Sequence, residues 1–192
     1  MFKITKHIDE SLIKTNWFGE LLEAFIPADS NIEGKTVNQL INSASRKAFS
    51  VSFAAAIPPG FFGWATLIPE LLTITKIQIN LVHSIAKYHN SEEKLNIALL
   101  SMIFATALGL ELGKGIFRKA GTELIVSKMS AELLRPILEK ISVKTLSRLL
   151  AKLPARWIPV ITAPIFGTWS AVNTKALGYA ADKIFSAKIE EE

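Results

Sequence analysis

A long run without formal charge, residues 48–69, limits what this chain can fold into more than any other segment. It is as long as the roughly 20 residues that a transmembrane helix needs. Pro58, Pro59 and Gly60 interrupt it, because proline lacks a backbone donor and glycine permits unusual dihedral angles. Only about ten uncharged residues precede the break, too few to cross a bilayer. We therefore predict a helix–turn–helix corner, mostly buried, instead of a membrane span.

The rest of the chain reads as helical, and no run of alternating β-branched residues indicates a strand. The fold class that this predicts is all-α, a single-domain multi-helix bundle with Pro/Gly-broken apolar helical hairpins. Pro136 should end or kink one helix, and Pro154, Pro159 and Pro164 should break the approach to the last one. Ser91 is the expected N-cap of the fourth helix. The predicted helices span residues 7–25, 36–57, 65–89, 92–112, 122–130, 131–142, 143–153 and 165–188.

The length of 192 residues favours one domain with a substantial core. Within it we expect an N-terminal helix and connector (1–35), a helical domain (36–188) and an acidic tail (189–192). The absence of cysteine excludes disulfides and thiolate metal sites. The N-terminal stretch has acidic and amide residues where a secretory signal would be apolar, so we expect a cytoplasmic protein.

The net charge of +5 is unevenly placed, because ten Lys or Arg and only three Glu lie between Lys114 and Arg156. Within this region a cationic ridge recurs at every fourth position, beside an apolar face. Its members are Lys140, Lys144, Arg148, Lys152 and Arg156. Such a ridge suits an anionic membrane surface or a membrane protein, although a solvated outer helix face explains it equally well. No aromatic residues are interleaved with it, so we do not expect a nucleic-acid partner.

Three polar side chains stand out in the helix predicted at 65–89. Gln78 and His83 lie within apolar stripes, where a buried polar group needs a hydrogen-bond partner. They either contact a ligand or tether the helix to a neighbour. Glu70 falls on the polar face, where simple exposure is expected. Asn173, on the apolar face of the last helix, should bond a backbone group of a facing helix.

The tip of the corner carries Phe61, Phe62 and Trp64, whose aromatic rings suit shallow insertion into a membrane or docking on a partner. Signatures of catalysis are missing: there is no HExxH, phosphate-binding glycine loop or GxSxG. His7, His83 and His89 are too dispersed to indicate a metal site. We therefore expect no metal and no cofactor, and nothing favours an enzyme.

Between Ala54 and Asn90 a small-residue helix meets a Pro/Gly break and then a proline-containing helix with a Gln. The residues that carry this pattern are Pro58, Gly60, Gly63, Pro69, Gln78, Ile85, Ala86 and Tyr88, followed later by Pro159, Gly167 and Asn173. In these residues, over about 45–185, the chain resembles the EcsC protein family. In the family a Gly is expected after the Tyr, whereas here Tyr88 is followed by His89 and Asn90. Asn90 can still end the helix in place of the glycine. The resemblance implies a bacterial protein from transport, secretion and membrane contexts, with no defined activity.

The leading hypothesis is an EcsC-like protein that docks peripherally on an anionic membrane through the basic helix and the aromatic tip. One alternative is a pore-forming or membrane-disrupting effector that uses the 48–69 hairpin. Another is a soluble helical scaffold that binds a protein. A ligand-binding bundle or enzyme centred on Gln78, His83 and Glu70 would require those side chains to converge on one cavity.

Overall fold

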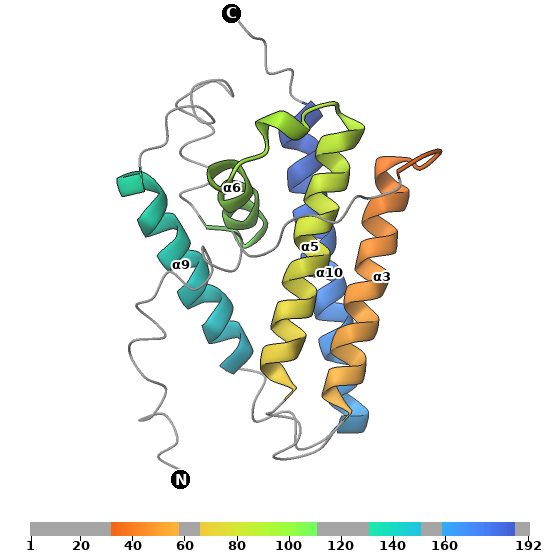
Figure 1. Cartoon of the computed structure of the whole chain (residues 1–192). Helices are drawn as coiled ribbons and strands as arrows, with labels where there is room; N and C mark the ends of the chain where they lie inside the picture. The colour runs from red at the N-terminus through yellow and green to blue at the C-terminus, as the bar shows by residue number, and fades with distance from the viewer. Residues whose placement is uncertain (1–31, 58–65, 111–130, 151–158, 187–192) are drawn as a thin grey trace, which may run out of the picture.

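The computed structural model of the protein describes residues 32–57, 66–110, 131–150 and 159–186 (Figure 1). Within these ranges the chain forms helices joined by turns, without a strand. The predicted all-α multi-helix bundle is confirmed. Its elements are α3 (Val37–Ala56), α5 (Leu67–Tyr88), the short 3-10 helix η2 (Glu92–Lys94), α6 (Ile97–Ala107), α9 (Ala131–Leu150) and α10 (Pro159–Ser186).

Helices α3, α5 and α10 pack side by side, and α6 and α9 lie on the opposite side of α5 and α10 from α3 (Figure 1). Helix α3 runs antiparallel to α10, since Ile41 meets Gly178 near one end and Ser52 meets Ser170 towards the other. Helix α5 runs parallel to α10. The core lies between these helices, and its largest fully buried side chains include Ile41, Ile79, Ile85, Ile103, Ile141 and Leu177.

Small residues bring α3 and α10 close together. Ala44, Ala48, Ser52 and Ala56 recur at every fourth position of α3 and are all buried. On α10, a Cβ atom at Gly178 would lie 2.6 Å from Cγ1 of Ile41. A Cβ atom at Gly167 would lie 2.8 Å from the Phe49 ring and 3.1 Å from its backbone carbonyl oxygen. The two glycines are therefore required by packing at these positions.

The helix ends follow local capping chemistry. Thr36 and Gln39 form a capping box at the start of α3, with bonds of 3.3 and 2.8 Å. The expected cap at Ser91 is wrong: Asn96 caps α6, accepting from the Leu99 N–H at 2.9 Å, because η2 intervenes. Asn90 has a positive φ of 52° at the end of α5, the conformation that glycine usually supplies at such ends.

Two predicted interruptions near prolines are wrong, whereas a kink at Pro136 stays a prediction. Residues 131–150 form one continuous helix with Pro136 inside it, instead of two helices with a break or a separate basic helix. Helix α10 begins at Pro159 and continues through Pro164, so the expected break before residue 165 does not occur there. Both internal prolines are exposed and lie in the second turn, where solvent can satisfy the carbonyl left without an N–H partner.

Several predictions fall outside the described residues: the helices at 7–25 and 122–130, the tip residues Phe61, Phe62 and Trp64, the ridge residues Lys152 and Arg156, and the acidic tail. Among the residues that the structure describes, no helix combines the length and hydropathy needed to cross a membrane.

Candidate functional site

A chain of three buried side chains joins the three packed helices. Ser52 of α3 donates to Glu70 Oε1 of α5 at 2.5 Å, and its hydroxyl lies 2.5 Å from that of Ser170 on α10. Because a hydroxyl has one proton, Ser170 donates to Ser52 while Ser52 donates to Glu70. None of the three is more than 2% exposed. Linked hydrogen bonds of this kind polarise one another in a low-dielectric interior.

The burial of Glu70 corrects the expectation that it lies on an exposed face. Glu70 is 2% exposed, whereas its apolar neighbours on the same helix, Ile68 and Leu72, are 59% and 38% exposed. Helix α5 is therefore rotated about its axis so that the carboxylate enters the bundle. Serine hydroxyls on α3 and α10 make this rotation possible, since a buried carboxylate needs donors.

A second polar contact between α5 and α10 lies two turns along α5. Gln78 Nε2 donates to Oγ1 of Thr174 at 3.2 Å, and Thr174 is fully buried. Gln78 therefore tethers α5 to a neighbouring helix, as one of its two sequence interpretations proposed. It also reaches a cavity, so the other interpretation stays open as well.

That cavity lies between α5, α10, α9 and the end of α6, with a volume of about 80 Å³. It is partly open to solvent and its wall is mainly apolar. The apolar part comes from Leu71, Ile74, Phe104 and Leu108, with Trp169 beside them. The polar part is formed by Glu70, Thr75, Gln78, Thr145, Arg148, Ser170 and Asn173. The structure thus brings Glu70, Gln78 and Asn173 to one space together with a member of the predicted ridge.

Arg148 lies in the cavity wall and not on an outward cationic ridge. Its guanidinium donates to Asn173 Oδ1 at 3.4 Å and to the Leu108 carbonyl at 3.5 Å, both long bonds. Its carbon Cζ lies 5.7 Å from the centre of the Trp169 ring, a cation–π contact. The side chain is half-buried. The spacing of four residues did not indicate this inward position of Arg148. Helix α9 is inclined to the bundle, and its C-terminal end lies nearer to α5 than its start does (Figure 1).

Asn173 is fixed by its own helix. Its Nδ2 donates to the Trp169 carbonyl one turn earlier at 2.8 Å, while Oδ1 accepts from Arg148. The expected bond to a backbone group of a facing helix is wrong. The amide instead holds its oxygen towards the guanidinium, which places a polar pair on the cavity wall.

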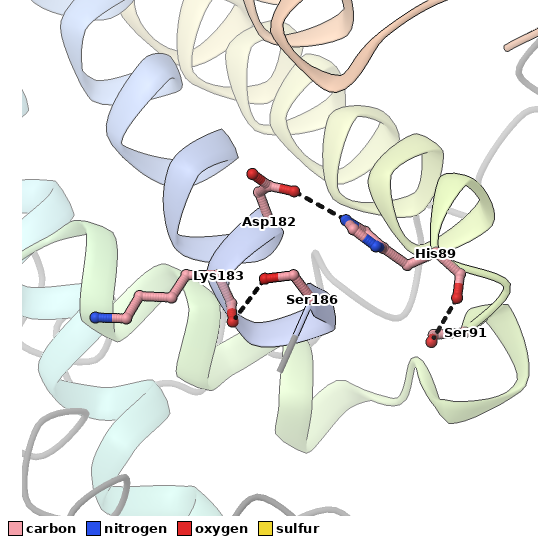
Figure 2. A network of polar contacts seen from close by, with 5 residues as sticks. All are labelled: His89, Ser91, Asp182, Lys183 and Ser186. Atoms are coloured by element: carbon pink, nitrogen blue, oxygen red, sulfur yellow. Dashed lines mark hydrogen bonds and ion pairs between the residues drawn. The ribbon is translucent and has the colours of Figure 1, made fainter. Parts of the chain in front are cut away.

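His83 does not line this cavity. Its Nε2 lies 4.0 Å from Glu92 Oε1, and its Nδ1 is buried without a hydrogen-bond partner among the described residues. His89 lies close by at the end of α5, and Figure 2 shows it facing Asp182 of α10, with Nε2 2.8 Å from Oδ1. The three-residue site of Gln78, His83 and Glu70 is therefore not assembled, since His83 belongs to the other end of the bundle.

The remaining ridge residues in the described part of the chain face outward. Lys140 is exposed and Lys144 is half-exposed on α9, next to Val143, which is 42% exposed. Arg135 is also exposed, one turn before Lys140. This outer face of α9, defined by Lys140, Val143 and Lys144, combines positive charge with an apolar side chain, and the exposed acid Glu139 lies one turn before Val143.

Sequence reasoning missed Ser52, Ser170 and Thr174, which hold Glu70 and Gln78 in place. The sequence did not reveal them, because a serine or threonine within a helix can serve either as a small packing residue or as a hydrogen-bonding group. Ser52 is in fact one of the four small residues of the α3 stripe. Only the facing carboxylate reveals its second role.

The donor set of the site suits an organic ligand better than a metal ion. Within the described ranges, no group of three or more His, Asp or Glu side chains is placed to hold a metal. An apolar wall with one carboxylate, one guanidinium and two amides can instead bury a small molecule and orient its polar end. In comparisons with known proteins, no family model, no curated protein and no solved structure matches this chain.

Proposed function

We propose that this chain is a helical binding protein whose cavity between α5, α6, α9 and α10 takes a small, largely apolar molecule with one polar end. The observation that carries this is the convergence of Glu70, Gln78, Arg148 and Asn173 on one mainly apolar cavity. Protein interiors normally contain few voids larger than a water molecule. A mainly apolar space with a few converging polar groups has the composition of a ligand site, and its small volume restricts the occupant to a small molecule.

The size of the cavity limits the ligand. A volume of about 80 Å³ has room for about six water molecules when each needs about 10–15 Å³. A molecule with a short hydrocarbon chain fits such a space, with one end in the open mouth. Burying its methylene groups contributes about 0.8 kcal/mol each.

Filling the cavity tests this proposal. The probes are three six-carbon molecules, hexanoate, 1-hexanol and hexylamine, titrated by calorimetry into the full chain. We expect at least one to bind with a Kd of about 1 mM or tighter. Leu71→Trp should abolish that binding, because Leu71 lines the cavity, whereas Leu72→Trp should not, because Leu72 is exposed. Ile74→Phe is a second filling variant, and circular dichroism checks the fold of each.

The proposal fails if none of the three probes binds the wild-type chain. It also fails if Leu71→Trp and Ile74→Phe, once folded, bind as the wild type does.

A second candidate function is docking on an anionic membrane surface, and the outer face of α9 favours it. Lys140 and Lys144 lie beside the exposed Val143, with one exposed acid, Glu139, on the same face, on a helix that among the described elements packs mainly against α6. A basic residue close to an anionic bilayer contributes about 1 kcal/mol. Insertion of the aromatic tip residues Phe61, Phe62 and Trp64, which lie outside the described residues, would add to this attraction.

Vesicle flotation tests the docking. The chain should float with vesicles that contain phosphatidylglycerol and remain behind in high salt, which screens the attraction. Lys140→Glu combined with Lys144→Glu should abolish flotation. Lys47→Glu, an exposed charge reversal on α3, should change it little. Failure to float with any lipid composition would count against docking, and dye leakage from the same vesicles would favour the pore-forming alternative.

The EcsC resemblance remains a proposal about descent. Several residues that suggested it have defined places here: Gln78 and Asn173 both line the cavity, and Gly167 packs against Phe49. If the resemblance reflects common descent, a structure of an EcsC family member should show the equivalent residues around a similar cavity. Their placement on separate surfaces would count against it.

A further inference from the structure

The two charged groups in the cavity wall differ in how fully the protein satisfies them. Glu70 is almost completely buried, and it accepts the Ser52 hydroxyl, which is itself supported by Ser170. Arg148 is half-buried, and among the described residues it donates two long hydrogen bonds, both to neutral oxygens. In the described part of the chain no carboxylate pairs with Arg148.

A guanidinium has five N–H donors in a planar fork, and this geometry matches a carboxylate with two parallel hydrogen bonds. The Asn173 oxygen, at 3.4 Å, uses one of the donors weakly. The Trp169 ring lies under the guanidinium and restricts its orientation. Arg148 is therefore held in position at the cavity wall, and the described residues use only part of its donor capacity.

The rest of the wall selects the charge of the ligand. Leu71, Ile74, Phe104 and Leu108 offer hydrocarbon surface, which suits an apolar chain and not a small inorganic anion. If a ligand carried two carboxylates, Arg148 could pair with one of them, and the Glu70 carboxylate of the same cavity would repel the other. A cationic ligand would meet the guanidinium in a space of about 80 Å³.

We propose that the cavity binds a small monocarboxylate with an apolar tail, whose carboxylate is held by Arg148 and whose tail lies against Leu71, Ile74, Phe104 and Leu108. This rests on the proposed function, since it names the ligand class of the same cavity. The ligand carboxylate replaces the weak contact of Arg148 with Asn173. The Thr145 hydroxyl in the same wall is a further donor for it. Short free carboxylates and the acid end of a longer fatty acid share this chemistry.

Matched probes of one chain length test the charge selection. Titration of the full chain should show hexanoate binding at least about tenfold more tightly than 1-hexanol, as expected for a charge-assisted hydrogen bond, and hexylamine binding least. Arg148→Met, which keeps the length of the side chain, should remove the preference for hexanoate while 1-hexanol binding changes by less than about twofold. Lys144→Met, one turn earlier on α9 and half-exposed, should leave both affinities unchanged.

The outcomes separate this inference from the proposed function. If 1-hexanol or hexylamine binds as tightly as hexanoate, the ligand class is wrong and the binding function stands. If Arg148→Met retains the preference for hexanoate, Arg148 is not the anchor and the inference fails. If no probe binds the wild type, both fail. A series from butanoate to decanoate identifies the source: affinity that levels off near six carbons indicates a free short acid, and a continued rise indicates a fatty acid.

Discussion

The two faces of α10 show opposite ways of packing. Towards α3, Gly167 and Gly178 leave no room for a methyl group, and the facing Phe49 and Ile41 side chains fill the contact. Towards α9, Trp169 and Asn173 border a partly open cavity. The same helix thus provides a tightly packed contact on one face and the wall of a cavity on the other. Stability therefore depends mainly on the face towards α3, whereas the proposed binding depends on the face towards α9, so substitutions on the two faces should have different effects.

The largest expected effect is at the tight face. Gly178→Val would place side-chain atoms where Ile41 and Leu81 lie, with Cβ alone 2.6 Å from Ile41 Cγ1. Ile41 and Leu81 are both buried, so neither can move aside without disturbing the core. We expect a loss of about 3 kcal/mol in the free energy of unfolding, measured by urea denaturation.

Tyr179→Val is the matched control, since it introduces the same residue next door at an exposed position. It should change the stability by about 0.5 kcal/mol or less. Equal losses for the two variants would show that the α3–α10 contact is not as tight as described.

A smaller effect is expected at the buried hydrogen-bonded chain of Ser52, Glu70 and Ser170, which joins α3, α5 and α10. Ser52→Ala removes one donor to Glu70 and the acceptor of Ser170, while both of these residues stay buried. The loss of a hydrogen-bond partner for a buried group costs about 1–3 kcal/mol, and we expect a loss in this range. Ser50→Ala, on the exposed side of α3, should cost no more than about 0.5 kcal/mol in the same urea titration. A loss at Ser52 no larger than that at Ser50 would contradict the polar chain.

The smallest effect is expected at the far end of the α5–α10 contact. Asp182→Ala removes the partner of His89, but Asp182 is 37% exposed, so water replaces much of the interaction (Figure 2). We expect a loss of about 0.5 kcal/mol. Lys183→Ala, an exposed neighbour, serves as the control in thermal unfolding. A loss above about 2 kcal/mol at Asp182 would show that this polar pair is worth as much as the buried one.

The sequence allowed prediction of the fold class and the ranges of two central helices. Residues 36–57 and 65–89 were expected as helices and contain α3 and α5, because apolar periodicity and nearby prolines mark them clearly. The continuity of α9 and α10 was not predictable in this way. Exposed prolines near a helix start do not end the helix when tertiary packing holds the remaining turns.

The site was less predictable than the helices, because its residues depend on helix rotation and inclination. Gln78 and Asn173 stood out as polar residues in apolar stripes. Glu70 shares a helix face with polar residues, so the sequence indicated simple exposure. Nothing in the sequence indicated that Ser52 of α3 and Ser170 of α10 would face it. Arg148 shared its spacing with Lys140 and Lys144, and only the inclination of α9 separates its role from theirs.

The glycines of α10 have a consequence for how a ligand enters and leaves. Gly167 and Gly178 are eleven residues apart, about three turns, so both meet α3 from the same side. A slide of α10 by one turn, about 5.4 Å, would bring residues with side chains against Phe49 and Ile41. The α10 wall is therefore held in register against α3, whereas among the described elements α9 packs mainly against α6. For the proposed ligand, release is then expected through the α9 side of the cavity, and Arg148, its proposed anchor, belongs to that side.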